Sequence, residues 1–234
     1  EVLVASTGII GHHLPMAKIK SGISKSSESL GNKNTHAISI AKAIMTTDLT
    51  HKQIAVKTKI GGKDVTIGAI AKGSGMISPN MATMFCFITT DAAISLNTLR
   101  SCIKRSTESS FNQITVDGHM STSDMVAILA NGMAQNRTIT SSTKNDLTQF
   151  QKALDYVTLN MAKEIVKDGE GATKFIQIEI HEAKSTSDAK KIARSIAESP
   201  LVKTAINGED PNWGRIVSAA GYAGVALDES RLKL

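Results

Sequence analysis

The segment that stands out in this chain is residues 71–84, which contains a threonine at position 83, although its composition alone would not select that threonine as a nucleophile. Two glycines and the Pro79-Asn80 pair break the chain before that threonine, small Ala82 directly precedes it, and an apolar run follows. In such a place a threonine is ordinarily a β-branched strand former. Its hydroxyl can also act as a nucleophile, but only beside a base. If the bond after Ala82 were cut, the new α-amine, with a reference pKa of about 7.7–8.0, would be that base. The residues alone leave both interpretations open.

The other candidate motifs in the chain lack the residue spacing that phosphate, dinucleotide or metal binding requires. Residues 61–64 (GGKD) lack the spacing and the hydroxyl of a phosphate-binding loop, and residues 73–75 (GSG) lack the third glycine of a dinucleotide fingerprint. His12 and His13 are adjacent, so they cannot share a face of a helix or strand, which argues against a metal site. The two cysteines lie in apolar or helical surroundings and are expected to be buried free thiols. We expect no metal and no cofactor.

Composition narrows the class of protein. The chain has 234 residues, of which 41% are hydrophobic and 21% charged, which is typical of a globular protein with a real core. Aromatic residues make up only 3%, which disfavours a base-stacking platform for single-stranded nucleic acid. The net charge of +6 leaves open a basic binding domain without enzymatic activity, whose nucleic-acid affinity would fall with salt. The longest purely apolar run, residues 125–130, is too short to cross a bilayer.

The elements that must position these residues alternate between strand and helix patterns. The clearest helix is 146–167, where apolar residues recur every three or four positions. Two alternating segments around Gly61-Gly62 predict a hairpin. We expect strands at 1–7, 54–60, 65–71, 83–88, 114–116, 176–180 and 201–206, and helices at 15–25, 35–45, 96–111, 123–129, 146–167, 187–197 and 213–220. The predicted class is α/β or layered α+β.

Several blocks of sequence resemble the ornithine acetyltransferase (glutamate N-acetyltransferase) family of arginine biosynthesis. They occur in the family's order and extend over nearly the whole chain, at residues 4–11, 43–48, 71–84, 167–172, 199–205 and 210–215. The resemblance implies an αββα-type sandwich with a self-cleaving threonine nucleophile. Because the family's chains are considerably longer, it also implies an internal piece that lacks both ends, with further substrate contacts beyond Leu234. On that basis this exact chain is expected to bind substrate poorly.

The resemblance implies a mechanism centred on Thr83. The Thr83 hydroxyl attacks the carbonyl of Ala82, which divides the protein into an upstream chain, 1–82, and a downstream chain, 83–234, that share one catalytic core. From about residue 199 a smaller second domain is expected to begin. The same hydroxyl then takes the acetyl group of N-acetylornithine and passes it to glutamate in a ping-pong reaction. Whether acetyl-CoA also serves as a donor is left open by the sequence.

The family's other site residues can be carried over one by one. The Thr7 hydroxyl and the Gly8 N–H would stabilise the oxyanion of the tetrahedral intermediate. Lys72 and Thr46 resemble the family's substrate lysine and threonine, with Thr47 as the competing choice, and Thr83 itself also contacts substrate. Glu170 would meet the ornithine ammonium. The chain departs from the family at His119-Met120, where a second acidic residue and a threonine are more usual.

The resemblance also implies small amino-acid substrates, no nucleic-acid or membrane partner, and a heterotetramer of two cleaved chain pairs. It implies a cytoplasmic enzyme, or one of the mitochondrial matrix if the source is a eukaryote. The main alternative is a self-cleaving aminopeptidase or hydrolase with an amino-terminal nucleophile and a similar fold. That enzyme would use water as the acceptor and release free acetate without glutamate.

Overall fold

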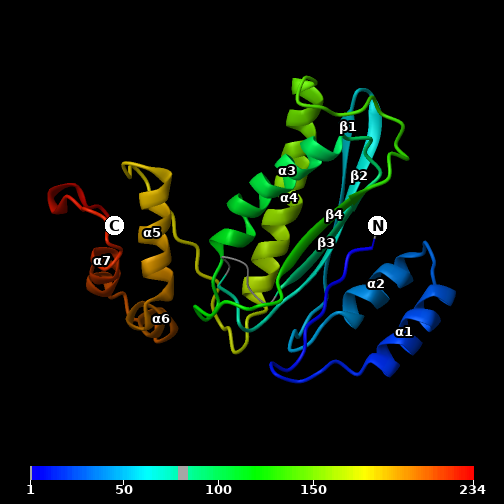
Figure 1. Ribbon diagram of the computed structural model, residues 1–234. Coiled ribbons are helices and arrows are strands. Elements are labelled where there is room, and N and C mark those ends of the chain that lie inside the picture. The colour runs from blue at the N-terminus through cyan, green and yellow to red at the C-terminus, as the bar shows by residue number, and fades with distance from the viewer. Residues whose placement is uncertain (1, 79–83) are drawn as a thin grey trace.

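The computed structural model describes residues 2–78 and 84–234 and is built around a four-stranded sheet in the order β1-β2-β3-β4 (Figure 1). The strands are β1 (Lys52–Ile60), β2 (Lys63–Lys72), β3 (Phe85–Thr90) and β4 (Met125–Ala130). The helices are α1 (Met16–Glu28), α2 (Asn34–Ala43), α3 (Leu96–Ser109), α4 (Lys144–Lys167), α5 (Thr186–Glu198), α6 (Pro200–Asn207) and α7 (Trp213–Gly221), with short 3-10 turns at Phe111–Gln113 and Glu229–Arg231. The predicted α/β class is confirmed.

The β1–β2 hairpin begins the sheet and follows directly from the sequence. Gly61 and Gly62 both have positive φ angles, 55° and 80°, which a tight turn with right-handed strand twist requires. The antiparallel register pairs Ile60 with Lys63 next to the turn. Alternation then directs the aliphatic residues of β1 to one face and its lysines 57 and 59 to the other. The predicted hairpin is therefore confirmed.

The main core lies between the sheet and the α3–α4 layer (Figure 1). β3 and β4 are parallel, and α3 lies in the connection between them, where it packs against α4. The apolar stripe of α4 is buried as its periodicity predicts, and it packs on β1 and β2. The fully buried side chains of that stripe are Phe150, Leu154, Val157, Met161 and Ile165. Each is worth about 1.5–3 kcal/mol relative to exposure, so α4 anchors the sheet.

The opposite face of the sheet contacts α2, whose Ala41 is fully buried. In Figure 1, α1 and α2 lie on the other side of the sheet from α3 and α4, and no residue of α1 is buried. The segment from 44 to 51 leads from α2 into β1. This route brings the polar residues after α2 beside the end of β2, where the candidate site lies.

The last three helices form a second, smaller cluster (Figure 1). Its buried apolar members are Ile192, Ile196, Val202, Ala219 and Ala220. A hydrogen bond connects this cluster to the sheet domain: Lys203 Nζ donates to the Val116 carbonyl at 2.6 Å. Among the described residues, no helix has the length and apolar character needed to span a membrane.

Several predicted elements are wrong, and each has a physical reason. Residues 201–206 form helix α6, because Ser199 caps it by accepting the Val202 N–H and Pro200 occupies its first turn. Residues 125–130 form strand β4, because pairing with β3 in the sheet outweighs the local helix pattern. The segments 2–7, 114–116 and 176–180 lie in no strand. Ile178 and Ile180 instead pack on the α5–α7 cluster without a partner strand.

Candidate active site

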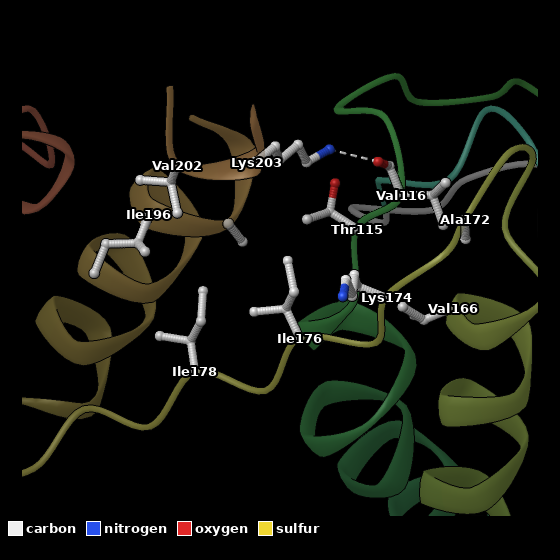
Figure 2. A pocket seen from close by; sticks show the side chains of 11 residues that line it. Thr115, Val116, Val166, Ala172, Lys174, Ile176, Ile178, Ile196, Val202 and Lys203 are labelled. Carbon is white, nitrogen blue, oxygen red and sulfur yellow. Dashed lines mark hydrogen bonds between the residues drawn. The ribbon is translucent and has the colours of Figure 1, made fainter. Parts of the chain in front are cut away.

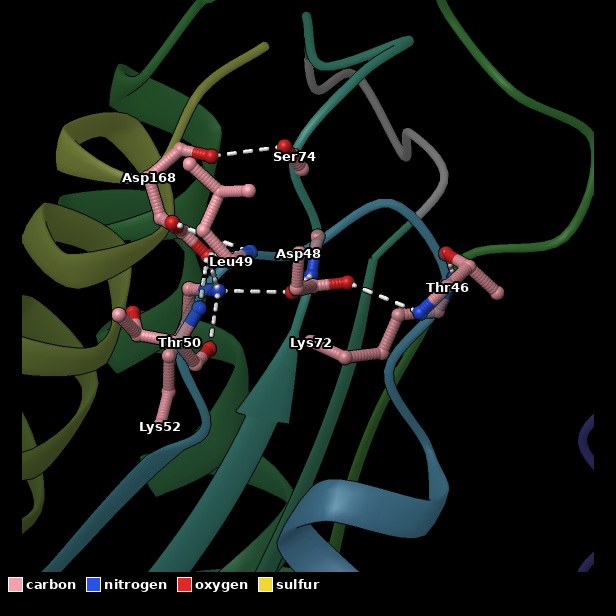
Figure 3. A network of polar contacts seen from close by, with 9 residues as sticks. Thr46, Asp48, Leu49, Thr50, Lys52, Lys72, Ser74 and Asp168 are labelled. Atoms are coloured by element: carbon pink, nitrogen blue, oxygen red, sulfur yellow. Dashed lines mark hydrogen bonds and ion pairs between the residues drawn. The ribbon is translucent and has the colours of Figure 1, made fainter.

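A buried ionic network lies where β1 begins and α4 ends (Figure 3). Lys52 Nζ is 2.7 Å from Asp48 Oδ1 and 2.6 Å from Asp168 Oδ2. The side chains of Lys52 and Asp48 are 1% and 0% exposed, and that of Asp168 is 7% exposed. Burying such charges costs several kcal/mol unless hydrogen bonds complete their shells. The network must therefore be well satisfied.

Backbone donors complete the shells of both carboxylates. Asp48 accepts the N–H groups of Gly73 at 2.7 Å and Thr46 at 3.2 Å. Asp168 Oδ2 accepts those of Leu49 and Thr50 at 3.1 and 3.2 Å. Burial alone would raise the pKa of Asp48, but its bonds to Lys52, Gly73 and Thr46 outweigh burial and lower that pKa.

These bonds hold three distant segments together. The loop 46–52 supplies Asp48 and Lys52, the end of β2 supplies the Gly73 amide, and the end of α4 supplies Asp168 (Figure 3). A further hydrogen bond joins the end of β2 to the end of α4, because the Ser74 hydroxyl donates to the Asp168 carbonyl at 2.7 Å. The network thus fixes the geometry of the segments that carry the predicted substrate residues.

Lys72, at the end of β2, is one of these residues and is 2% exposed. Its Nζ donates to Thr46 Oγ1 at 3.1 Å and lies 5.5 Å from the centre of the Phe85 ring. Burial lowers the pKa of Lys72, and the charges of Asp48 and Asp124 only partly oppose this. Within the described part of the chain, Lys72 forms no ion pair. A buried ammonium in that state is suited to an anionic ligand.

The structure joins Lys72 to Thr46 and not to the competing Thr47. The side-chain bond is between Lys72 Nζ and Thr46 Oγ1, and Thr46 is held from behind by its own N–H bond to Asp48. Thr47 is exposed. Thr46 is thus the threonine of this pair that the fold positions beside the lysine.

Glu170 lies two residues beyond the network and against the same loop. Its N–H donates to the Ser74 carbonyl at 3.0 Å. A Cβ added at Gly75 would be 2.7 Å from the Cδ of Glu170, so the carboxylate occupies the space above that glycine. Glu170 is exposed. The fold therefore brings Thr46, Lys72 and Glu170 to one region.

No contact among the described residues brings the other predicted site residues to the region of Lys72. Thr7 and Gly8 lie in an N-terminal segment without regular structure, half-buried and exposed respectively. Across residues 2–78 and 84–234, no hydrogen bond links either of them to Lys72 or Glu170. Ala82 and Thr83 lie outside the described residues. The nearest described residue is Met84, whose N–H donates to Asp124 Oδ1 at 2.7 Å.

The charged residues that support the site have no role that the sequence pattern predicts. Asp48 and Asp168 stand in blocks that match the family, whereas Lys52 and Asp124 lie outside those blocks. The sequence does contain an indication that Lys52 is buried. Lys52 lies on the same face of β1 as Ile54 and Val56, which pack on the core. A lysine at an inward position of a strand requires buried acidic partners.

A separate pocket lies between the sheet domain and the α5–α7 cluster (Figure 2). It has a volume of about 110 Å³, below the roughly 300–1,000 Å³ typical of ligand sites. Its lining is mainly apolar and includes Ile176, Ile178, Ile196 and Val202. Because no predicted site residue lines it, this pocket is not the candidate site.

Comparison with known families shows the family of this chain. The model of the ArgJ family matches residues 1–234, and the chain belongs to this family. The family resemblance inferred from the sequence blocks is thereby confirmed.

Individual relatives carry the name "Arginine biosynthesis bifunctional protein ArgJ". The protein from Oceanobacillus iheyensis is 48% identical over 234 residues, covering 100% of this chain and 56% of its own. The protein from Thermotoga neapolitana is 50% identical over 234 residues, 58% of its own length. A crystal structure of the protein of that name from Bacillus halodurans is 45% identical, with a TM-score of 0.59 over 61% of this chain and 67% of that chain. This chain spans just over half the length of the two curated relatives.

Proposed function

We propose that this chain carries much of the catalytic core of an acetyltransferase of arginine biosynthesis, which moves the acetyl group of N-acetylornithine to glutamate. The observation that carries the proposal is the contact between buried Lys72 and Thr46, with Glu170 held against the adjacent loop. Glu170 bonds through its N–H to the Ser74 carbonyl, two residues beyond Lys72, which supports a shared role for the three residues. Relatives named as bifunctional arginine-biosynthesis proteins support the same assignment.

Thr83 is the proposed nucleophile, and its activation requires cleavage after Ala82. The Thr83 hydroxyl attacks the Ala82 carbonyl, and hydrolysis of the resulting ester leaves Thr83 with a free α-amine. That amine then takes the hydroxyl proton as Oγ bonds to the acetyl carbon of N-acetylornithine. As the C–N bond breaks, the ammonium returns the proton to the departing ornithine amine. The amine of glutamate attacks the acetyl ester, and Oγ recovers its proton.

Each supporting residue has a proposed task. The Thr7 hydroxyl and the Gly8 N–H donate to the oxyanion of the tetrahedral intermediate. Lys72 and Thr46 bind the carboxylate of the amino-acid substrate, since a buried ammonium beside a hydroxyl can pair with it. Glu170 binds the side-chain ammonium of ornithine, for which an exposed carboxylate between glycines is accessible.

The proposal includes the wider properties of the family. No cofactor is needed, because an amide acetyl group passes to another amine, and acetyl-CoA is a further donor to be tested. The partners are small amino acids, and the assembly is a heterotetramer of two cleaved pairs, 1–82 with 83–234, in the cytoplasm or the mitochondrial matrix. Helices α6 and α7 belong to the smaller domain that we propose from about residue 199, and α5, which ends at Glu198, packs against both of them.

Intact-mass analysis and an acetyl-transfer assay on the full-length protein that contains this chain test the proposal. We expect two chains divided at Ala82/Thr83, a single chain in the Thr83→Ala variant, and acetylglutamate formed from N-acetylornithine. Lys72→Met should raise the KM for substrate at least tenfold, whereas Lys167→Met, an exposed lysine, should not. Cleavage in Thr83→Ala contradicts the nucleophile. Release of acetate without any need for glutamate identifies a hydrolase instead.

A further inference from the structure

The buried cation of Lys52 lies between two carboxylates, and each carboxylate holds a different end of the candidate site (Figure 3). Asp48 holds the end that carries Thr46, because its Oδ2 accepts the Thr46 N–H at 3.2 Å and its Oδ1 accepts the Gly73 N–H at 2.7 Å. Gly73 directly follows Lys72 in the chain. Asp48 therefore fixes the backbone on both sides of the hydrogen bond between Lys72 and Thr46.

Asp168 holds the other end of the site, where Glu170 lies. The Asp168 carbonyl accepts the Ser74 hydroxyl at 2.7 Å, and the Ser74 carbonyl accepts the Glu170 N–H at 3.0 Å. Ser74 is buried, so water does not compete for these bonds. The backbone of Glu170 is consequently fixed relative to the end of β2 and Lys72, while the Glu170 side chain stays exposed to a ligand.

The two ends of the site are close enough to bind one small molecule. The Glu170 carboxylate occupies the space above Gly75, where an added Cβ would be 2.7 Å from its Cδ. Gly75 is three residues beyond Lys72, and that length of backbone spans at most about 11 Å. An ammonium and a carboxylate on such neighbouring segments can pair with the carboxylate and the ammonium of one short amino acid.

We infer that the buried network of Asp48, Lys52 and Asp168 sets the separation between these two ends and thereby selects the chain length of the amino acid that binds. The inference rests on the proposed function, in which Lys72 binds the substrate carboxylate and Glu170 binds its side-chain ammonium. Lysine is one methylene longer than ornithine, and diaminobutyrate is one methylene shorter. A ligand of the wrong length leaves one charged group without its partner, and one methylene can change affinity at least about tenfold. The three network residues act through the segments they hold and are positioning residues.

The test measures ligand binding by titration calorimetry in the full-length protein that contains this chain, with ornithine, lysine and diaminobutyrate as probes. None of these amino acids carries an acetyl group, so they bind without supplying a donor for the reaction. The main variant is Asp168→Asn, which removes the charge that lies 2.6 Å from Lys52 Nζ. The matched control is Asp146→Asn at the start of α4, where Asp146 Oδ1 accepts the Gly61 N–H of the β1–β2 turn at 3.1 Å.

We expect the wild-type protein to bind ornithine at least about tenfold more tightly than either of the other two amino acids. In Asp168→Asn this preference should fall at least about threefold, because the charge that holds the end of α4 against Lys52 is gone. Asp146→Asn should keep the affinity and the preference of wild type. Ser74→Ala removes only the hydroxyl bond to the Asp168 carbonyl, so it should lower the preference in the same direction even if Asp168→Asn does not fold.

Two results overturn the inference. One is a wild-type protein with no preference for ornithine, and the other is a pair of variants that keep the wild-type preference, whether or not all three affinities fall by the same factor. The proposed function stands in either case if the wild-type protein forms acetylglutamate from N-acetylornithine. A wild-type protein that neither binds ornithine nor transfers acetyl groups contradicts the proposed function, and the inference falls with it.

Discussion

The Nζ of Lys52 and the Oδ2 of Asp168 lie 2.6 Å apart, although 116 residues separate them in the chain. One residue begins an edge strand and the other closes the longest helix. Because both side chains are buried, neither can exchange its partner for water. The ion pair therefore locks the end of α4, and Glu170 just beyond it, against the loop that carries Thr46.

Replacing Lys52 with methionine should be strongly destabilising. It leaves Asp48 and Asp168 as two buried carboxylates without their shared cation, and breaking such a pair costs about 3–5 kcal/mol. Urea unfolding measures the loss. Lys167→Met is the matched control, since it removes an exposed lysine paired with Glu164 and should cost less than about 1 kcal/mol. Equal losses in the two variants would show that the buried network contributes no more than a surface pair.

Acid should destabilise the protein through Asp48. Its pKa is lower in the folded state than in the unfolded chain. The resulting stability is fully present above the unfolded-state pKa of about 3.9 and is lost as pH falls through the folded-state value. Melting temperatures measured down to about pH 2 should fall less steeply in Asp48→Asn than in wild type, from a lower starting value at neutral pH. Parallel curves for the two proteins would exclude Asp48 as a source of the acid sensitivity.

Gly75→Ala should affect substrate binding more than stability. The new methyl group would be 2.7 Å from the Glu170 carboxylate, which is the end of a flexible and exposed side chain and can move away. The free energy of unfolding should therefore change by less than about 1 kcal/mol. Under the proposed function, the KM for N-acetylornithine should rise because Glu170 is displaced. Combining Gly75→Ala with Glu170→Ala should add little to Glu170→Ala alone. Full additivity of the two effects would argue against this contact.

Both cysteines should be unreactive in the folded protein. Burial raises the pKa of Cys86 far above its usual value, and burial with the nearby Asp155 charge raises that of Cys102 to about 11. Because the thiolate is the reactive form, a thiol reagent at about pH 8 should label neither cysteine before urea is added. Mass spectrometry should find both labelled after unfolding. Rapid labelling of Cys86 in the native protein would contradict its burial in the sheet.

The sequence is sufficient for those parts of the fold that depend on local pattern. The 61–62 turn depends on glycine, the α4 stripe on periodicity and the start of α6 on the Ser199-Pro200 cap. The apolar run 201–206 favours a strand by local pattern, and the cap is the feature that indicates a helix instead. Strand β4 could not be found in this way, because its structure depends on pairing with β3.

The candidate site also contains some residues that the sequence predicts and others that only the structure reveals. Lys72, Thr46 and Glu170 are proposed because whole blocks of sequence match a family, and no local rule would select them. The Lys52–Asp168 pair joins distant segments, so only a three-dimensional structure reveals it. Among the described residues, the buried Oδ2 of Asp124 has no hydrogen-bond partner, which is likewise a property of packing, with no signature in the neighbouring residues.

The ladder between β2 and β3 has a consequence for the products of cleavage. Residues 67–72 pair with residues 85–90, and the bond between positions 82 and 83 lies in the connection between these strands. If that bond is cut, the antiparallel ladder and the packing of α4 on β1 and β2 become contacts between two polypeptides. The fragments should separate on a denaturing gel and travel together on a sizing column. The subunit interface of the mature protein would then be a former intramolecular core, and neither fragment should refold without the other.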